Sequence, residues 1–214
     1  MRPWRSRDGA EGPAERLVAE LALHVDDARV LTAIRAVPRD RFVPARRREE
    51  AWDNHALPIG SGQTISQPLV VARMCELLEL SGDERVLDVG TGSGYHAAVL
   101  ARLAEHVWSI ERHEELSRRA AESLRTSAIE NVTLRVGDGT RGLPEEAPFE
   151  VINVAAAGSA KALSELEDQL APGGRLVAPV SGVQQRLVLT TRTPVGLVRR
   201  LFEEVRFVPL VDDR

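Results

Sequence analysis

Long apolar runs and a basic excess are both missing from this chain of 214 residues. No window of about 18 apolar residues predicts a membrane span, and residues 1–12 contain arginines but no apolar stretch typical of a secretory signal. The formal net charge is −4 and the isoelectric point is near 5.8, which leaves no electrostatic footprint for nucleic acid. We expect a cytoplasmic protein with no membrane or nucleic-acid partner.

Cysteine is almost absent as well, since the chain has one, Cys75. A single cysteine excludes an internal disulfide and fits a reducing compartment. The histidines show no spacing typical of a metal site or a catalytic triad, so no metal is expected. They are His24, His55, His96, His106 and His113. The length predicts one domain, preceded by a flexible tail at residues 1–13, and a monomer is the expected state.

The most informative stretch is residues 85–95, Arg-Val-Leu-Asp-Val-Gly-Thr-Gly-Ser-Gly-Tyr. Its apolar start predicts a short buried strand, and three alternate glycines then turn the chain into a helix that begins near Tyr95. The glycines are Gly90, Gly92 and Gly94. Glycine permits positive φ and lets a ligand approach the main chain, and a helix start presents unpaired amides. The stretch therefore predicts a ligand-binding loop.

Asp88 decides which ligand the glycine loop suits. A dinucleotide-binding loop has a similar glycine pattern, but its pyrophosphate is disfavoured beside a carboxylate. S-adenosylmethionine has no phosphate and carries a cationic sulfur and an ammonium group. Two charges about 4 Å apart interact by about 4 kcal/mol at an effective dielectric near 20. Asp88 therefore favours S-adenosylmethionine over NAD.

Two further carboxylates follow predicted strands. Glu111 ends the second strand, 17 positions beyond Gly94, where nucleotide-binding βαβ folds hydrogen-bond ribose hydroxyls. Asp138 follows the third strand, beside Gly139, and it could equally be a plain turn aspartate. Because ligands bind at the carboxyl edge of open α/β sheets, Asp88, Glu111 and Asp138 are expected to converge there.

Strand and helix patterns alternate along the chain. They predict an α/β fold with a doubly wound, mostly parallel, seven-stranded sheet and an N-terminal helical extension. The predicted strands are 86–89, 107–110, 132–136, 149–154, 175–180, 186–191 and 205–210, with the last two antiparallel. The predicted helices are two within 13–36, then 69–80, 95–104, 114–126 and 163–170.

Residues 53–68 form a long predicted loop between helices, and a loop of this length is usually functional or disordered. It contains Gln63, Thr64, Ile65 and Ser66. Ser66 has a second interpretation as the cap of the next helix, because Pro68 follows it at the first turn. Both roles can hold at once, and the pattern alone favours the cap.

Several motifs together closely resemble bacterial protein-L-isoaspartate O-methyltransferases. Gln-Thr-Ile-Ser-Gln-Pro at 63–68 is far more specific than the glycine loop, which many methyltransferases share. The resemblance extends over about residues 17–210. The motifs lie at 51–60, 62–68, 85–95, 109–112, 137–139 and 206–210.

This resemblance implies a class I, Rossmann-like methyltransferase domain at 14–214, with substrate elements at 14–80 and a cofactor-binding sheet core at 81–214. The implied reaction methylates the α-carboxylate of L-isoaspartyl residues in damaged proteins or peptides, giving S-adenosylhomocysteine and starting repair through a succinimide. Ser66 would be the active-site serine, with Gln63, Thr64, Ile65 and Ala156 at the substrate. The implied cofactor-binding residues are Asp88, Gly90, Gly92, Gly94, Glu111, Asp138 and Gly139.

One segment departs from the family pattern. Residues 154–160 lack the threonine and prolines that usually line the substrate site there. The departure motivates an alternative, in which the same scaffold methylates an aspartate of one dedicated peptide. Methylation of nucleic-acid amines is disfavoured, because Asn153 is followed by neither prolines nor an aromatic residue. A non-catalytic scaffold is disfavoured by the intact 63–66 motif.

Overall fold

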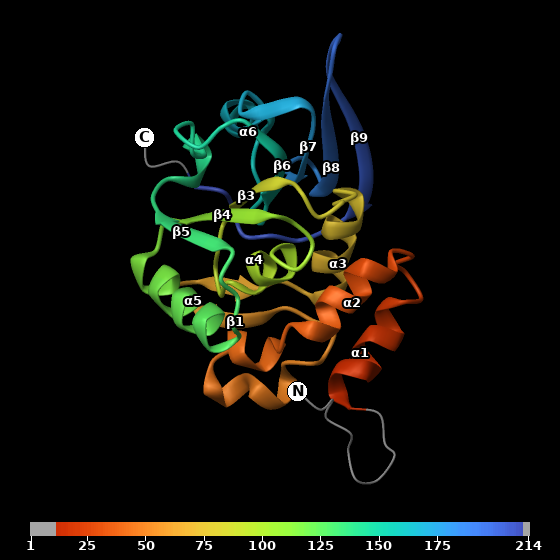
Figure 1. Cartoon of the computed structure of the whole chain (residues 1–214), viewed down its shortest axis with the longest axis vertical. Coiled ribbons are helices and arrows are strands. Elements are labelled where there is room, and N and C mark those ends of the chain that lie inside the picture. The colour runs from red at the N-terminus through yellow and green to blue at the C-terminus, as the bar shows by residue number, and fades with distance from the viewer. Residues whose placement is uncertain (1–11, 212–214) are drawn as a thin grey trace.

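The computed structural model describes residues 12–211 and shows a seven-stranded sheet with helices on both faces (Figure 1). The strand order is β5-β4-β3-β6-β7-β8-β9. The first five strands in this order are parallel, and β8 and β9 join antiparallel. The predicted doubly wound, mostly parallel α/β fold is confirmed. The sheet strands are β3 (Arg85–Val89), β4 (His106–Glu111), β5 (Val132–Val136), β6 (Phe149–Val154), β7 (Leu170–Val180), β8 (Arg186–Thr193) and β9 (Gly196–Glu204).

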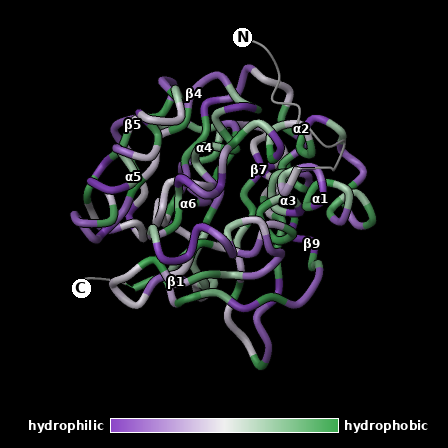
Figure 2. The backbone as a smooth tube through the Cα atoms, turned by 90° about the horizontal axis from the view of Figure 1, so that it is seen from below, coloured by the Kyte–Doolittle hydropathy of each residue, from purple (hydrophilic) through white to green (hydrophobic). Residues whose placement is uncertain are grey.

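Alternate residues of the central strands enter two separate hydrophobic clusters. On β3, Val86 packs with α1 to α5 and Leu87 packs with α6 on the other face. A central parallel strand is buried on both faces, so its sequence is a nearly continuous run of apolar residues. On the outer helix α5 only one side is buried, and Figure 2 shows both hydrophobic and hydrophilic residues along this helix. The helices are α1 (Pro13–Leu21), α2 (Ala28–Ala36), α3 (Pro68–Leu77), α4 (Tyr95–Leu100), α5 (Glu114–Thr126) and α6 (Ala160–Glu167), with short 3₁₀ helices η1 (Arg39–Phe42), η2 (Ala45–Glu50) and η3 (Gly139–Arg141).

The N-terminal helices share one core with the sheet. The predicted break between α1 and α2 is confirmed, because Asp27 is the N-cap of α2 and accepts a hydrogen bond from the Arg29 amide at 2.8 Å. The Glu76 carboxylate on α3 accepts from the amides of Asp26 and Asp27. The predicted tail lies outside the described residues up to residue 11, and α1 begins at Pro13. Within residues 12–211, no helix is both long and apolar enough to cross a membrane.

The prediction of an irregular loop at 53–68 was wrong, because it contains a hairpin of β1 (Leu57–Gly60) and β2 (Gln63–Ile65). The two-residue turn has positive φ at both positions, 51° at Ser61 and 70° at Gly62. Such turns match the twist of hairpin strands, and they favour Asn-Gly or Asp-Gly over Ser-Gly. Because the two strands are so short and the turn is Ser-Gly, the sequence pattern did not predict the hairpin.

The predicted strand at 205–210 was also wrong, since the last strand is β9, whose arginines and glutamates obscured it. Residues 205–211 instead run along the sheet edge with an isolated bridge between Ala157 and Pro209. The Ala157 amide donates to the Val208 carbonyl, and the Leu210 amide donates to the Ala157 carbonyl, both at 2.8 Å. Pro209 has no N–H and cannot extend a ladder. Helix ends also differ, since α3 and α4 stop at Leu77 and Leu100 and α6 starts earlier than predicted.

Candidate functional site

The glycine loop follows β3 at the carboxyl edge of the sheet. Its glycines all have positive φ, 94° at Gly90, 53° at Gly92 and 85° at Gly94, a backbone region that disfavours other residues. Gly94 is the N-cap of α4, and a Cβ there would lie 3.0 Å from the Ala120 Cβ on α5. Gly94 therefore serves the packing of two helices, and it lines none of the cavities described below.

A cavity at this edge, here called the sheet-edge cavity, collects most of the predicted site residues. Glycines from two loops line it, together with two residues of β2 and residues 208–211. The predicted residues that line it are Gln63, Thr64, Gly90, Gly92, Glu111, Gly139 and Ala156. The structure thus brings together residues from five separate parts of the chain.

Glu111 sits at the wall of this cavity with only 5% of its surface exposed. Its Oε2 accepts a hydrogen bond from the Gly92 amide at 2.8 Å, and its Oε1 accepts from the His113 amide at 2.9 Å. An ionised carboxylate has about four acceptor positions, so two amides leave capacity for hydroxyl donors. Glu111 is therefore fixed in place and still able to bind a diol.

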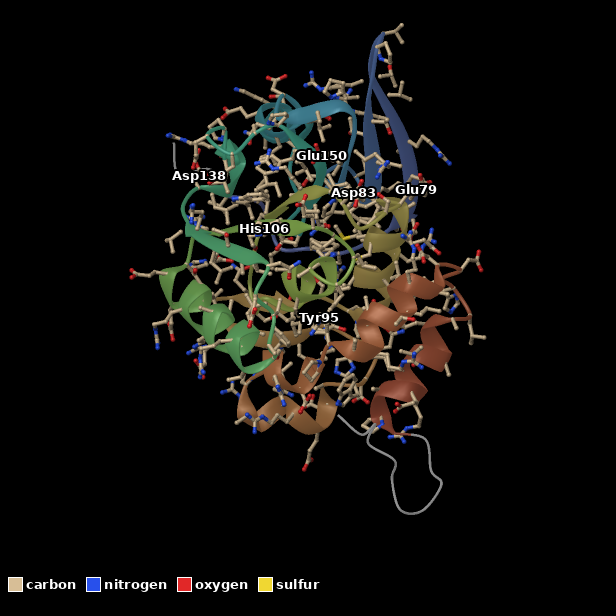
Figure 3. All side chains as sticks on the ribbon, viewed as in Figure 1. Glu79, Asp83, Tyr95, His106, Asp138 and Glu150 are labelled. Carbon is tan, nitrogen blue, oxygen red and sulfur yellow. The ribbon has the colours of Figure 1, made fainter. Side chains whose placement is uncertain are left out.

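Asp88 and Asp138 do not line the sheet-edge cavity. Asp88 is fully buried below the glycine loop, and burial raises the pKa of its carboxyl to about 6, against hydrogen bonds from Ser109 and Asn153 that lower it. Asp138, labelled in Figure 3, is the N-cap of η3 and accepts from the amide and hydroxyl of Thr140. The interpretation of Asp138 as a turn residue is confirmed, and any direct ligand contact of either carboxylate stays a prediction.

Ser66 lies where a narrow passage joins the glycine loop to an outer groove. The passage is lined by Ser66, Gly90, Gly92 and His96 among others. The outer groove, of about 460 Å³, is lined by Ser66 and by residues 204–208. Thr64 and Ala155 line the cavity, the passage and the groove alike, so the three lie side by side around these two residues. Ser66 is half-buried, and no described residue forms a hydrogen bond with its hydroxyl.

The cap interpretation of Ser66 was wrong. The N-cap of α3 is Gln67, and no side chain caps the helix from that position. Asn54 satisfies this helix end instead, since its Oδ1 accepts from the Leu69 amide at 3.1 Å and its carbonyl accepts from the Gln67 side chain at 3.0 Å. Ser66 therefore does not cap the helix, and Asn54 holds the loop that contains Ser66.

Sequence reasoning missed Asn54 and Arg39, although both lie in or near the family motifs. Arg39 is fully buried, and its guanidinium donates to the carbonyls of Ala51 at 2.8 Å and His55 at 3.2 Å, holding both sides of Asn54. It also stacks 4.8 Å from the ring centre of Tyr95, labelled in Figure 3. Burial lowers the pKa of Arg39 to about 10, so the side chain stays charged at neutral pH.

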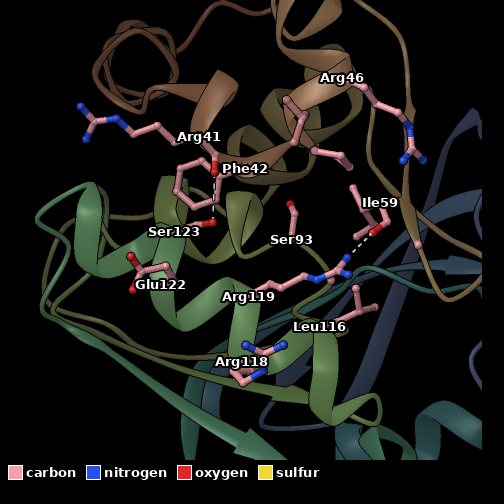
Figure 4. A pocket seen from close by; sticks show the side chains of 14 residues that line it. Arg41, Phe42, Arg46, Ile59, Ser93, Leu116, Arg118, Arg119, Glu122 and Ser123 are labelled. Carbon is pink, nitrogen blue, oxygen red and sulfur yellow. Dashed lines mark hydrogen bonds between the residues drawn. The ribbon is translucent and has the colours of Figure 1, made fainter.

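A larger cavity lies elsewhere and is here called the arginine-rimmed cavity (Figure 4). It measures about 520 Å³ and lies between η1, β1 and α5. Arg119 from α5 points across it and donates to the Ile59 carbonyl at 3.2 Å. Arg46 and Arg118 are exposed at its rim. Of the predicted site residues, only Gly92 reaches this cavity.

The sheet-edge cavity fits a cofactor that needs close approach to the main chain. A Cβ on Gly139 would lie 2.7 Å from Val89 Cγ1, and one on Gly90 would point at Ala155 from 3.7 Å. Side chains at these positions would clash or fill the space that a flat ligand needs. The cavity is lined by a carboxylate that can accept hydrogen bonds from hydroxyls, by glycine loops and by small side chains. This lining suits a nucleoside better than a phosphate.

The family model described as protein-L-isoaspartate(D-aspartate) O-methyltransferase matches residues 14–214. The chain belongs to this family. A protein-L-isoaspartate O-methyltransferase from Aeromonas hydrophila subsp. hydrophila is 50% identical over 199 residues, covering 92% of this chain and 97% of the relative. Protein-L-isoaspartate O-methyltransferase 1 from Rhodopseudomonas palustris is 52% identical over 204 residues, covering 93% and 83%.

Solved structures agree with the family. A protein-L-isoaspartate O-methyltransferase matches with a TM-score of 0.84 and 28% identity, covering 94% of this chain and 66% of that one. A second structure, from Plasmodium falciparum and in complex with S-adenosyl-L-homocysteine, has a TM-score of 0.83 at 24% identity, covering 94% and 99%, and supports the fold alone. As a member of this family, the chain is an S-adenosylmethionine-dependent methyltransferase.

Proposed function

We propose that this protein transfers a methyl group from S-adenosylmethionine to the α-carboxylate of L-isoaspartyl residues in damaged proteins or peptides. The observation that carries this proposal is that the sheet-edge cavity, the passage and the outer groove adjoin one another and share Thr64 and Ala155. A cofactor in the cavity and a polypeptide in the groove would meet in the passage beside Ser66. The bound cofactor supplies an electrophilic methyl carbon and leaves as S-adenosylhomocysteine.

The residues of the passage suit a reaction that depends on positioning. A substrate carboxylate has a pKa near ~4 and is already ionised at neutral pH, so no general base is needed. His96 is neutral, because burial lowers its pKa to about 3. Ser66 donates a hydrogen bond to one carboxylate oxygen and turns the other toward the methyl carbon. Alignment of this kind contributes roughly 7 to 11 kcal/mol.

Cofactor contacts follow from the wall of the sheet-edge cavity. Glu111 accepts hydrogen bonds from the ribose hydroxyls. Gly90, Gly92 and Gly139 have no side chains, so the cofactor can approach the main chain closely. Asp88 contributes through its charge from below, and Gly94 and Asp138 hold the two loops in shape. The substrate side is shaped by Gln63, Thr64, Ile65 and Ala156. The division between the substrate elements and the sheet core lies near residue 80, in the turn between α3 and β3.

The decisive assay is methanol release from an L-isoaspartyl peptide incubated with the protein and labelled S-adenosylmethionine. The matched control is the same peptide with a normal aspartyl residue. We expect release from the isoaspartyl peptide at least 100-fold above the aspartyl one. Equal methylation of both, or of neither, would contradict the proposal and favour a dedicated peptide substrate. The altered segment 155–160 motivates that alternative, and its first residue, Ala155, lines all three spaces.

We also propose that the protein works as a cytoplasmic monomer on polypeptides and not on nucleic acid. The free thiol of Cys75 is buried, which fits a reducing compartment. The net charge of −4 disfavours binding to a phosphate backbone. Light scattering after size exclusion tests the monomer, and a mass near 47 kDa, about twice that of the 23.5 kDa chain, would contradict it.

A further inference from the structure

A buried row of polar side chains lies below the glycine loop and is not used by the methyl transfer itself. Asp88 is at its centre and is fully buried. Its Oδ2 accepts a hydrogen bond from the Ser109 hydroxyl, and its Oδ1 accepts one from the Asn153 side-chain amide, each at 2.7 Å. Asn153 is itself fully buried, on the neighbouring strand β6, directly opposite Asp88.

The directions of these hydrogen bonds fix the protons along the row. Since Ser109 donates to Asp88, its oxygen accepts from the Thr91 hydroxyl of the glycine loop, at 2.6 Å. The Asn153 amide nitrogen also faces Nδ1 of His96, at 3.2 Å. That contact makes Nδ1 an acceptor and puts the imidazole proton on Nε2, which lies 3.6 Å from Cys75 Sγ.

No positive side chain balances Asp88 within the described residues, because none of the described cations forms an ion pair with it. The groups that face it are Ser109 and Glu111 from β4, Asn153 from β6, His96 from α4 and Cys75 from α3. None of these groups is a cation, and the Glu111 carboxylate raises the pKa of Asp88 further. The burial that raises the pKa of Asp88 to about 6 is opposed by the two donors alone.

We propose that Asn153 is a positioning residue for the charge of the cofactor. Its amide holds Asp88 in the ionised form below the glycine loop and holds His96 as the neutral Nε2–H tautomer in the wall of the passage. The resulting buried anion favours the sulfonium of S-adenosylmethionine over the neutral thioether of S-adenosylhomocysteine. It thereby favours binding of the methyl donor and release of the spent product.

This inference rests on the proposed methyl-transfer function, and its test uses binding alone. S-adenosylmethionine and S-adenosylhomocysteine share the adenine, ribose, carboxylate and ammonium groups and differ by one methyl group and one positive charge. The ratio of their dissociation constants therefore reports the interaction with the sulfonium. Failure of methanol release with an intact ratio would refute the substrate proposal and leave this one standing.

The experiment is calorimetry with both ligands on the full chain from pH 5.5 to pH 9, for the wild type and Asn153→Leu. Loss of a hydrogen bond to a charged group is worth about one pKa unit or more. The preference for S-adenosylmethionine is the dissociation constant of S-adenosylhomocysteine divided by that of S-adenosylmethionine. At pH 6.5 we expect this ratio to be about fivefold lower in Asn153→Leu than in the wild type. At pH 9 we expect the ratios of the two proteins to differ by less than about twofold.

The matched control is Asn131→Leu. Asn131 donates to the carbonyls of Ala101, Ala104 and Glu105 at the far end of α4, so this variant loses hydrogen bonds without touching Asp88. The wild-type preference is expected to decline as pH falls through about 6. An unchanged ratio in folded Asn153→Leu, or an equal change in Asn131→Leu, would overturn the proposal.

Nitrogen NMR of His96 gives a second readout that a purely structural role would not change. We expect the Nε2–H tautomer in the wild type and a mixture of tautomers in Asn153→Leu. If Asn153→Leu does not fold, Ser109→Ala removes the other donor to Asp88 and is expected to lower the ratio at pH 6.5 in the same way. If neither variant folds, a wild-type ratio that stays flat from pH 5.5 to pH 9 would refute the role of Asp88, and a declining one would support it.

Discussion

The two cavities beside Gly92 differ in size, position and lining. The arginine-rimmed cavity measures about 520 Å³, whereas the sheet-edge cavity measures about 80 Å³. The larger one lies between η1, β1 and α5, and its rim is exposed arginine side chains. The smaller one is lined by the fixed Glu111 carboxylate and by glycines, and it shares Thr64 and Ala155 with the passage beside Ser66. The proposed site is therefore distinguished by the chemical groups that line its cavity and not by the volume of that cavity.

Topology explains why we place the proposed site at the smaller cavity. From β3 the chain adds β4 and β5 on one side of the sheet and then β6 and β7 on the other. The loops after β3 and β6 therefore separate at the carboxyl edge, which is where open α/β sheets bind ligands. The arginine-rimmed cavity is lined mainly by η1, β1 and α5, and only Gly92 and Ser93 of the glycine loop reach it.

The largest expected effect is on Ser66→Ala. Loss of a preorganised hydrogen-bond donor typically lowers kcat by about 100-fold to 1,000-fold, and we expect a loss in this range for isoaspartyl peptide. Affinity for S-adenosylmethionine, measured by calorimetry, should stay within about twofold. Ser61→Ala, at the exposed hairpin tip, is the control and should behave as wild type. Equal losses of turnover and cofactor affinity would undo the assigned role of Ser66.

Glu111→Gln tests the cofactor side. The substitution keeps the shape but weakens acceptance from ribose hydroxyls and from the amides of Gly92 and His113. Hydrogen bonds to charged groups are worth about 1.5–3 kcal/mol, so affinity for S-adenosylmethionine should fall at least about tenfold. Glu115→Gln, on α5 beside the arginine-rimmed cavity, is the matched control. Unchanged calorimetric affinity in Glu111→Gln would remove Glu111 from the ribose.

His96→Gln tests the neutral wall of the passage through stability. The pKa of His96 falls from 6.5 to about 3 because of burial. The unfolded chain therefore takes up a proton below pH 6.5 that the folded chain refuses, and stability is lost as pH falls from 6.5 toward 3. Between pH 7 and pH 5 this costs about 2 kcal/mol, which the variant should not lose.

Urea unfolding at both pH values measures the effect, with His24→Gln as an exposed control. Asp88 acts in the opposite direction, because its pKa is raised to about 6 and protonation favours the folded form. The comparison between variant and wild type isolates His96. Equal acid losses in the two proteins would show that His96 is protonated in the folded state.

The smallest expected effect is on the double variant Arg46→Ala and Arg118→Ala. Both side chains are exposed at the rim of the larger cavity, and no described residue pairs with either. We expect kcat/KM for isoaspartyl peptide and cofactor affinity to change less than about twofold. A tenfold loss of either would place the reaction at the arginine-rimmed cavity.

The sequence predicted the cofactor half of the molecule better than the substrate half. The strand, loop and helix around Gly90 follow from local patterns, and so does Glu111 at the end of β4. The hairpin at 57–65 was missed because its turn is Ser-Gly, and β9 because its charged residues resemble an exposed loop. Asn54 and Asn153 act through residues far away in the chain, and no local pattern shows such contacts. Asp88 was found, but its burial was not.

A crystal structure of the protein with S-adenosylhomocysteine tests the account most directly. We predict the ribose hydroxyls on Glu111, the adenine beside Gly139 and the sulfur at the mouth of the passage that leads to Ser66. A ligand bound in the arginine-rimmed cavity, or a ribose that makes no contact with Glu111, would contradict the account.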